Sequence, residues 1–532
     1  MSKKKLKVLV GLSWPYANGR LHIGHVASSL PADALARFHR LQGNDVSFVT
    51  GSDCFGTPVL VQAHAEGVTP AQLVEKYHKH FVDDFAALGF SFDNYSKTIC
   101  QPHQDFVRAF HAEMYKGKYI YEKTAPQLYC EKCSKYLPDR YVEGICPHCK
   151  KEARGDSCDV CSKILEPQEL LSPRCKLCGT APVSRDTTQL YLKLSALEKE
   201  IQEFINKRKN LWTANAVGMA QRYVDEGLHD RAITRSMEWG IPVPREGWDD
   251  RRIYVWAEAV LGYLSASTPE FIKGGREGEY LHYYVHAKDN IPFHAIVYPG
   301  LILAHGNGKA KYHMPDVIVS SEYVMVGGQK MSKSKGNLIT AHELLSEFDA
   351  DMLRYYFLRT MGTTKDSNFT FTEFVNIVNG ELVNNFGNLV NRTLSFIKSK
   401  FDGVLLDVLP RPEPVNTAGQ IADEADEIMA AGQVTKALGR VMDIVNYGNK
   451  YFDECKPWQS VKTDTEKCKQ DLSDVLFIIS VCARVLEPFI PTAAKKVQAW
   501  LAAGTLPDID ILFKRLDPKE VDEKFAKYRG RA

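Results

Sequence analysis

The chain of 532 residues is long enough for several domains, and its 44% hydrophobic and 25% charged residues are typical of a globular protein, not a disordered or fibrous one. A formal net charge of +2 neither favours nor excludes a nucleic-acid partner, because basic patches need not appear in the sum. The basic start precedes only a short apolar run, and the most apolar stretch, residues 475–490, contains Ser480, Arg484 and Glu487. We therefore expect no secretory signal and no membrane span, and predict a cytoplasmic protein.

The first hundred residues alternate between strand and helix patterns. Strand-like runs cover residues 7–12 and 45–50, and helical patterns cover residues 22–42, 58–66 and 71–88. This alternation predicts a β-α-β unit and a parallel sheet that binds ligands at the carboxyl ends of its strands. Asp53 follows the second strand, so we expect it at that edge of the sheet.

His22 and His25 stand at the start of the first helical pattern, with Gly24 between them. Residues three apart share one face of a helix, beside unpaired N–H groups and the positive end of the helix dipole. Such a site suits phosphate, and Gly24 allows a ligand to approach the backbone. The alternative is a pair of surface histidines after a loop.

Eight of the thirteen cysteines form four Cys-x-x-Cys pairs, in a segment that interrupts the strand and helix alternation and is interpreted as an insertion. This spacing in a large chain is typical of metal knuckles. Because structural Zn²⁺ takes four thiolates, eight cysteines supply two closed sites. Unrelated reduced thiols are the alternative. The pairs are Cys130/Cys133, Cys146/Cys149, Cys158/Cys161 and Cys175/Cys178.

Strand-like runs resume at residues 252–256 and 281–285, followed by a helical pattern over 292–304 and a short strand over 317–320. The segment Lys330–Asn337 then interleaves three lysines with hydroxyls and is flanked by glycines. This composition indicates a mobile cationic loop, with a solvated basic turn as the alternative. From about Glu373 onward the periodicity is helical, and only the charged tail 517–532 is expected to be weakly tied down.

Together the segments His22-Ile23-Gly24-His25 and Lys330-Met331-Ser332-Lys333-Ser334 resemble the two signature motifs of class I aminoacyl-tRNA synthetases. The resemblance spans nearly the whole chain and is to the methionyl-tRNA synthetase family. The leucine, isoleucine and valine enzymes share both motifs but carry a large editing domain, and the cysteine enzyme holds zinc inside its substrate pocket. The similarity is carried further by residues 15–19, 53–58, 227–235, 254–256 and 383–388, and departures fall at Phe55, Ser236, Val260 and Tyr298.

This resemblance implies an α/β fold: a Rossmann-like parallel-sheet catalytic domain with a zinc-knuckle insertion and a C-terminal α-helical bundle. Dimeric relatives often carry a further C-terminal oligonucleotide-binding domain, for which the tail is too short, so a monomer is expected. The implied domains are residues 1–117 and 234–325 (the two catalytic halves), 118–233 (connective insertion with two zinc knuckles), 326–372 (lysine-loop junction domain) and 373–532 (anticodon-binding domain).

The resemblance also implies a nested grouping of the cysteines. Relatives with a single zinc keep the two middle pairs and lack both outer pairs, which makes sense if the outer pairs share one metal. Sequential pairing, first pair with second, is the alternative. The expected sites are Cys146, Cys149, Cys158 and Cys161 for one zinc, and Cys130, Cys133, Cys175 and Cys178 for the other.

The implied reaction has two steps. The carboxylate of L-methionine attacks the α-phosphate of ATP to give methionyl-adenylate and pyrophosphate, and the 3′ end of methionine tRNA then takes the methionyl group. His22 and His25, with Gly24, are expected at the ATP phosphates, and Lys333, assisted by Lys330, at the pyrophosphate side. Mg²⁺ is expected to hold the triphosphate. Arg235 is a further implied phosphate contact, with a surface salt bridge as the alternative.

By the same resemblance Asp53 binds the α-ammonium group of methionine, with a structural cap as the alternative. Aromatic walls suit the polarizable thioether, although each aromatic alone is more often a core residue. Trp14 is expected to contribute its backbone. The implied pocket consists of Tyr16, Trp256, Ala259, Val260, Tyr263, Phe293 and His294.

Asn388, Arg392 and Trp458 are implied to converge on the anticodon bases, where loop bases stack on aromatics and pair along their edges. The alternatives are a core tryptophan and a surface polar pair.

Two other functions stay open: a zinc-knuckle RNA-binding protein and a small-molecule nucleotidyltransferase. Methionine-dependent ATP–pyrophosphate exchange would separate a synthetase from the RNA-binding alternative. Because single-methylene discrimination is worth only about 1–3 kcal/mol, some editing of homocysteine is also expected.

Overall fold

The computed structural model describes residues 5–155, 157, 158, 160, 161, 163, 165–273, 278–331, 336–405 and 408–528. The chain forms two compact units. The sheet unit comprises Met1–Arg20, Asp45–Asp83 and Phe92–Ser320. The helical unit comprises Leu21–Asn44, Asp84–Ser91 and Ser321–Ala532.

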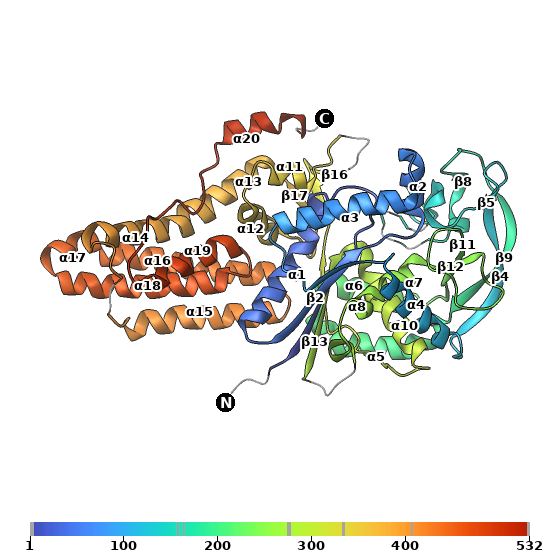
Figure 1. Cartoon of the computed structure of the whole chain (residues 1–532), viewed down its shortest axis with the longest axis horizontal. Helices are drawn as coiled ribbons and strands as arrows, with labels where there is room; N and C mark the ends of the chain where they lie inside the picture. The colour runs from blue at the N-terminus through green and yellow to red at the C-terminus, as the bar shows by residue number, and fades with distance from the viewer. Residues whose placement is uncertain are drawn as a thin grey trace. The chain divides into compact units, whose positions relative to one another are not determined.

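The sheet unit is built on a five-stranded sheet with the order β14-β13-β1-β2-β3. Two of its strands, β2 and β13, are labelled in Figure 1. β1 (Lys7–Leu12) pairs in parallel with both β13 (Tyr280–Ala287) and β2 (Asp45–Ser52), and β2 pairs in parallel with β3 (Asn94–Lys97). The edge strand is β14 (Val317–Ser321). Five of the six residues of β1 are buried, as expected for a central parallel strand that is covered on both faces. The predicted parallel sheet is confirmed.

The insertion contains a long antiparallel ribbon of β4 (Ile120–Cys130) and β9 (Val183–Leu192), flanked by β5 (Lys135–Tyr136) and β10 (Arg231–Ala232). A three-stranded sheet lies beside it in the sequence, with β6 (Val142–Ile145) between β7 (Glu152–Arg154) and β8 (Leu171–Cys175). The sequence pattern did not predict these strands individually, because short polar strands between metal knuckles carry little periodicity.

One predicted strand is partly wrong. Residues 252–256 were expected to be extended, but β12 (Arg251–Ile253), which pairs with β11 (Thr234–Ser236), ends at Ile253. Val255 and Trp256 begin the short helix α7 (Val255–Ala259) instead. Val and Trp favour strands, but tertiary packing outweighs this preference here, since four of the five residues of α7 are buried.

The other helices of the sheet unit follow the predicted pattern or occupy stretches that were not assigned. Their bounds are α2 (Thr57–Glu66), α4 (Gln101–Met114), α5 (Glu198–Arg208), α6 (Ala214–Asp225), α8 (Gly262–Ser265), α9 (Pro269–Ile272) and α10 (Tyr298–His305), with a π-helix over Phe293–Val297; α3 (Pro70–Ala87) runs from the sheet unit into the helical unit.

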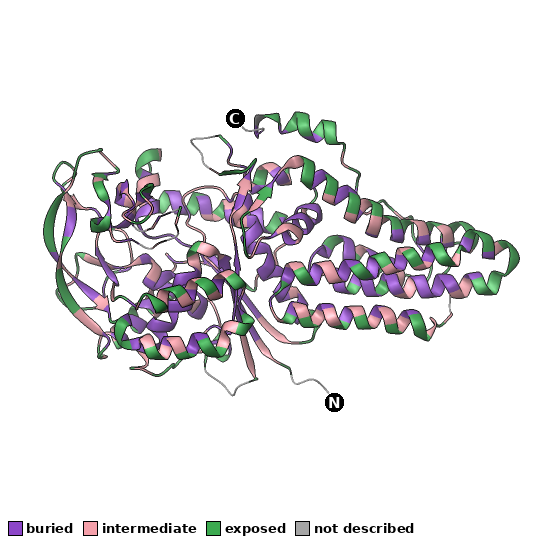
Figure 2. Cartoon of the chain, turned by 180° about the vertical axis from the view of Figure 1, so that it is seen from behind, coloured by how far each residue is buried: buried purple, intermediate pink, exposed green. Residues whose placement is uncertain are grey.

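The helical unit contains α1 (Ile23–Leu41) and a bundle in which α15, α16 and α18 run side by side (Figure 1). Buried and exposed bands alternate along these helices, as expected for amphipathic bundle helices (Figure 2). The helical pattern predicted from about Glu373 is confirmed. The bundle helices are α14 (Asn388–Lys400), α15 (Pro412–Ala430), α16 (Val434–Cys455), α17 (Pro457–Thr463), α18 (Thr465–Leu486) and α19 (Pro491–Ala502).

Before the bundle, the helical unit has a small sheet with the order β16-β15-β17. β15 (Val324–Val326) pairs in parallel with β17 (Ser367–Phe369) and antiparallel with β16 (Gln329–Lys330). The neighbouring helices are α11 (Ala341–Leu345), α12 (Ala350–Thr360), α13 (Phe371–Ile377) and a π-helix over Val378–Gly387.

The expectation of a weakly tied tail is wrong for residues 518–528. They form α20 (Pro518–Lys524) and one further turn, with Val521 and Phe525 buried. The ring of Phe525 stacks on that of Phe371, with centroids 4.2 Å apart. The four-residue spacing of Val521 and Phe525 is that of an apolar helix face, although the segment as a whole is highly charged. Among the described residues, no helix is both long enough and apolar enough to cross a membrane.

Candidate functional site

The two histidines of the first motif lie stacked at the start of α1, with ring centroids 3.8 Å apart. His22 is the N-cap residue, and its Nδ1 accepts from the backbone N–H of Gly24 at 3.1 Å. The Nδ1 of His25 accepts from the backbone N–H of His22 at 3.3 Å. Both rings therefore help satisfy the backbone donors at this helix start.

These bonds fix how the imidazoles can act. Because each Nδ1 is an acceptor, a neutral ring carries its proton on Nε2 and presents a donor there. Burial lowers the pKa of His25 to about 4, so this ring is neutral at neutral pH. The pair is thus set to donate hydrogen bonds to an anion without carrying a full charge.

The lysine motif lies partly outside the described residues, which include Lys330 and Met331 but not Lys333. Lys330 lies in β16, with its Nζ 4.6 Å from the ring centroid of Tyr323. A Cβ on Gly24 would come within 3.2 Å of the Met331 Cε and 3.0 Å of the His22 ring. The two motifs therefore meet within the helical unit, and glycine is the residue that leaves room between them.

Asp53 directly follows β2 and is buried. Its backbone N–H donates to the carbonyl of Pro15 at 2.8 Å, and its Oδ1 accepts from the backbone N–H of Phe55 at 3.2 Å. Burial, followed by the charge of Glu258, raises the pKa of Asp53 well above its ordinary value, while the Phe55 N–H and Arg140 oppose this. Such a carboxyl is poised for a cation that would stabilise its ionised form.

Aromatic side chains come together from α7, α8 and the π-helix. The rings of Trp256 and Phe293 lie 4.0 Å apart, and the Tyr263 hydroxyl lies 2.8 Å from the His294 Nε2. The His294 Nδ1 lies 2.9 Å from the carbonyl of Asn290, so Nδ1 carries the proton and Nε2 accepts from Tyr263. Ala259 and Val260 are buried beside them in the sequence. Val260, Tyr263 and Phe293 thus belong to one hydrophobic core cluster. Trp256, Tyr16 and Trp14 pack against this cluster, and His294 joins it through the Tyr263 hydroxyl.

The side chain of Trp14, and not only its backbone, has a defined place. A Cβ on Gly51 would come within 2.4 Å of the indole, and one on Gly262 within 2.5 Å. Trp14 is therefore wedged between the strand that leads to Asp53 and helix α8. Tyr16 lies beside Asp53 in an isolated parallel bridge, with the Arg140 guanidinium 5.4 Å from its ring centroid.

Arg235 is buried and has several partners in the sheet unit. Its Nε donates to Asp139 at 3.1 Å, its Nη1 donates to the carbonyl of Ala232 at 2.8 Å, and its guanidinium lies 3.9 Å from the ring centroid of Tyr254. The ion pair is buried, unlike the surface salt bridge considered above. A contact with phosphate stays a prediction, and it would require Arg235 to exchange its present partners.

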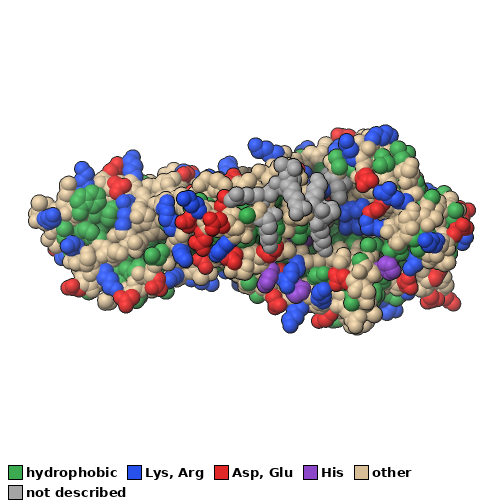
Figure 3. Space-filling model, turned by 90° about the horizontal axis from the view of Figure 1, so that it is seen from above, with side chains coloured by type: hydrophobic (Ala, Val, Ile, Leu, Met, Phe, Trp, Pro, Cys, Tyr) green, Lys and Arg blue, Asp and Glu red, His purple; other side chains and the backbone are tan. Residues whose placement is uncertain are grey.

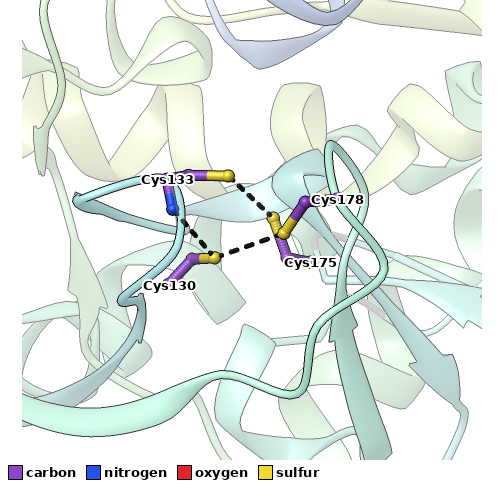
Figure 4. A group of neighbouring side chains, drawn as sticks. All are labelled: Cys130, Cys133, Cys175 and Cys178. Carbon is purple, nitrogen blue, oxygen red and sulfur yellow. Dashed lines mark hydrogen bonds between the residues drawn. The ribbon is translucent and has the colours of Figure 1, made fainter.

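The eight cysteines gather into two groups of four, and the nested grouping is confirmed. In one group the Sγ atoms of Cys130 and Cys178 lie 3.5 Å apart, and those of Cys133 and Cys175 lie 4.0 Å apart (Figure 4). All four sulfurs of each group lie within 4.8 Å of one another. The second group consists of Cys146, Cys149, Cys158 and Cys161, with Sγ separations of 3.8 Å for Cys146–Cys161 and 3.5 Å for Cys149–Cys158.

In the helical unit, Asn388 and Arg392 share α14 as predicted, and Trp458 is the second residue of α17. The Trp458 side chain is 44% exposed, which argues against a core role. Figure 3 shows hydrophobic side chains gathered on the surface at the end of the bundle where α17 lies. Arg392 donates to Asp453 at 2.7 Å, and its guanidinium lies 4.3 Å from the ring of Phe452, which in turn lies 6.2 Å from Trp458.

Sequence reasoning missed Glu258, which lies in α7 between two predicted pocket residues. Its side chain is 0% exposed, and its Oε2 lies 2.8 Å from the Nε2 of His103, which is also buried. The available signal was a lone carboxylate in the otherwise uncharged run of residues 255–264. A single charge in such a run indicates a buried ionisable group that needs a partner.

Comparisons with known proteins agree with this arrangement. The family model described as "tRNA synthetases class I (M)" matches residues 8–394, and that of the "Anticodon binding domain of methionyl tRNA ligase" matches residues 416–520. The chain is 40% identical over 541 residues to methionine–tRNA ligase 1 of Alkaliphilus oremlandii, covering 98% of this chain and 99% of that protein. It is 39% identical over 545 residues to a methionine–tRNA ligase of Bacillus cereus, covering 99% of each.

The fold also matches a solved structure, the Mycobacterium tuberculosis methionyl-tRNA synthetase in complex with methionyl-adenylate. The TM-score is 0.78 at 23% sequence identity, and the match covers 96% of this chain and 100% of that one.

Proposed function

The chain belongs to the class I methionyl-tRNA synthetase family, and from this premise we propose how its own residues carry out the reaction. It is a methionine–tRNA ligase that activates L-methionine with ATP to methionyl-adenylate and pyrophosphate, and then transfers the methionyl group to the 3′ end of methionine tRNA. The observation that carries the site assignment is the start of α1, where two stacked imidazoles present Nε2–H donors.

At this helix start, His22 and His25 donate hydrogen bonds to the phosphates of ATP, and the small size of Gly24 allows the close approach. In-line attack at phosphorus builds charge on the phosphate oxygens, so neutral donors held in place lower the barrier without reorganising. Lys333, with Lys330, neutralises the pyrophosphate side. Mg²⁺ bound with ATP would supply further neutralisation of the triphosphate. Arg235 joins the phosphate contacts if it exchanges Asp139 for substrate.

In the amino-acid site, Asp53 receives the α-ammonium group of methionine. A buried carboxyl whose pKa is raised gains most from a cationic ligand, because the ion pair then forms in a low dielectric. Trp256 and Phe293 form the wall of the pocket against the thioether. The hydrogen-bonded pair of Tyr263 and His294 forms the polar end of the pocket. Tyr16, Ala259 and Val260 complete the pocket, and the wedged Trp14 fixes the backbone that leads to Tyr16.

Each cysteine group holds one structural Zn²⁺. A tetrahedron with Zn–S bonds of about 2.3 Å places its sulfurs about 3.8 Å apart, and the closest sulfur pairs here span 3.5–4.0 Å. Four thiols with no open position fit a structural metal better than a catalytic one. The zinc ions would hold the short strands of the insertion together.

The bundle reads the anticodon of methionine tRNA. Trp458 is an exposed indole at a helix start, and it offers a stacking platform for an unstacked base. Asn388 and Arg392 supply donors and an acceptor one helical turn apart. A monomeric state and a cytoplasmic location stay predictions from the sequence, and sedimentation at micromolar concentration tests the first.

The test is amino-acid-dependent ATP–pyrophosphate exchange with each of the twenty amino acids. Methionine should support exchange at least about a hundredfold better than leucine or isoleucine, because the polar end of the pocket has no partner in a branched aliphatic side chain. Exchange that prefers another amino acid, or that does not depend on any, would overturn the assignment.

A further inference from the structure

We propose that Glu258 is a second carboxylate of the amino-acid site, with its Oε1 facing the α-ammonium group of methionine while His103 holds its Oε2. The proposal rests on the assignment of the ammonium group to Asp53 made above. Glu258 belongs to α7, between Trp256 and Ala259, which line the proposed pocket for the methionine side chain.

The first observation is an unused oxygen. Glu258 is 0% exposed, and one carboxylate oxygen is held at 2.8 Å by His103, whose other ring nitrogen lies 2.8 Å from the Ser265 hydroxyl. The second oxygen, Oε1, is buried and has no hydrogen-bond partner among the described residues. A buried oxygen of a charged group without a donor is costly, so it indicates that a donor is supplied from outside the chain.

The second observation places this oxygen at the amino-acid site. The Trp14 indole is in contact range of both Gly51, two residues before Asp53, and Gly262, one helical turn after Glu258. The ring centroids of Trp14 and His103 lie 5.9 Å apart. The Trp14 side chain therefore lies between the strand that leads to Asp53 and two groups close to Glu258: helix α8, which follows α7 in the chain, and His103, which holds the Glu258 Oε2. After burial, the charge of Glu258 is the next largest cause that raises the pKa of Asp53, in keeping with this placement.

The third observation is a missing positive charge. Burial lowers the pKa of His103 to about 3, so this ring is neutral at neutral pH and does not balance Glu258. The other charged group that acts on Asp53 is Arg140, which opposes it only as the weakest of four influences. Burial also raises the pKa of Glu258 well above its ordinary value, so both buried carboxyls lack a cation strong enough to stabilise their ionised forms. The substrate ammonium brings a positive charge and three donors to this place.

The experiment uses Glu258→Gln in the full chain and three ligands that separate the two ends of the amino acid. Methionine carries both groups, L-methioninol keeps the ammonium but lacks the carboxylate, and 4-(methylthio)butanoate keeps the carboxylate but lacks the ammonium. KM for methionine and the inhibition constant of methioninol should each rise about 10- to 100-fold, the scale of a lost hydrogen bond to a charged group. The inhibition constant of the acid and KM for ATP should stay within about twofold.

Two further variants keep the test decisive. Glu258→Asp preserves the charge and should restore part of the discrimination between methioninol and the acid. His103→Gln loosens the hold on Oε2 and should give the same ligand pattern with a smaller effect. A uniform weakening of all three ligands, accompanied by a lower thermal midpoint, would mean that Glu258 is only structural and would overturn the proposal.

Asp53→Asn separates this inference from the proposed function. If Asp53→Asn weakens methionine and methioninol but Glu258→Gln changes neither, the function assigned to Asp53 stands and the role of Glu258 is rejected. In that case a water between the Trp14 Nε1 and the Glu258 Oε1, both of which lack a partner among the described residues, is the better account. If Asp53→Asn leaves the ammonium preference intact, the assignment of Asp53 fails instead.

Discussion

Asp33 and Arg354 form an ion pair in which both side chains are 0% exposed, with Nη2 and Oδ2 2.7 Å apart. Asp33 lies in α1, the helix that begins with the histidine motif, and Arg354 lies in α12. The guanidinium of Arg354 also donates to the carbonyls of Phe489 and Pro488 in the turn after α18, each at 3.0 Å. One buried cation thus fixes α1, which begins at the histidine motif, to the bundle within the helical unit.

Replacing Arg354 with methionine should destabilise the helical unit by up to about 3–5 kcal/mol, because it breaks a buried ion pair and leaves Asp33 with only Arg37 and Ser91 as side-chain partners. Burial by itself raises the pKa of Asp33, but Arg354 and Arg37 outweigh it and hold the pKa below the ordinary 3.8. The contribution is therefore present at neutral pH and is lost as the pH falls below that value. The midpoint of urea unfolding measures the effect.

The matched control is Arg440→Met, which removes ion pairs with Glu424 and Asp443 on the bundle surface. Exposed pairs contribute about 0–1 kcal/mol, so this variant should shift the midpoint little. Equal shifts of the unfolding midpoint for the two variants would show that the buried pair contributes no more to stability than the exposed ones.

The nested cysteine groups predict which double substitutions share a metal. Cys130→Ser with Cys175→Ser should leave about one zinc per chain, since both changes fall in one group. Cys130→Ser with Cys146→Ser should leave none, because each group loses a thiolate that a closed tetrahedral site needs. Zinc content after dialysis, measured by mass spectrometry, gives the count. Sequential sites would reverse the two results.

Methionine binding should depend on pH through Asp53. Burial and then Glu258 hold the pKa of Asp53 well above its ordinary value, and Arg140 opposes them. The ammonium group pairs with the ionised carboxylate, so the Kd for methionine should fall as the pH rises toward this raised pKa, by up to about tenfold per unit. Titration calorimetry from pH 5.5 upward follows it. Asp53→Asn should give a flat profile, and a flat profile in the unchanged protein would reject the idea.

The parallel sheet, the helical bundle and the existence of two four-cysteine sites could be predicted because each has a local pattern: alternation, helical periodicity or Cys-x-x-Cys spacing. Which cysteines share a site followed only from the family resemblance. Other features depend on contacts distant in the sequence. The helix at Val255 and Trp256 follows from tertiary burial against a β-prone local sequence. The Asp33–Arg354 pair joins residues 321 positions apart, and nothing near either residue marks it. The sequence marks Glu258 as a lone charge in an apolar run. That its Oε1 has no hydrogen-bond partner among the described residues, while its Oε2 contacts His103, can be found only from the structure.

Lys333→Ala should lower the rate of methionine-dependent pyrophosphate exchange by about a hundredfold or more, the usual scale for losing one preorganised charge contact at a transition state. KM for methionine should change little, because the lysine is proposed to act on the pyrophosphate side. Lys309→Ala, an exposed lysine outside the motif, serves as control and should keep full activity. Unaltered exchange in the Lys333 variant would remove this residue from the mechanism.

Trp458→Ala should weaken charging of methionine tRNA while leaving pyrophosphate exchange nearly intact. Losing one stacking aromatic costs about 1–3 kcal/mol per base, so kcat/KM for tRNA should fall about 5- to 150-fold. The thermal midpoint should hold, because the indole is 44% exposed and little packing is lost.

Trp500 in α19 offers the contrast, since it is only 6% exposed. Trp500→Ala should lower the thermal midpoint strongly, as expected for a core aromatic whose removal costs about 3–5 kcal/mol. If Trp458→Ala instead behaved like Trp500→Ala, with both activities and stability falling together, Trp458 would be a packing residue and the anticodon contact would have to lie elsewhere on the bundle.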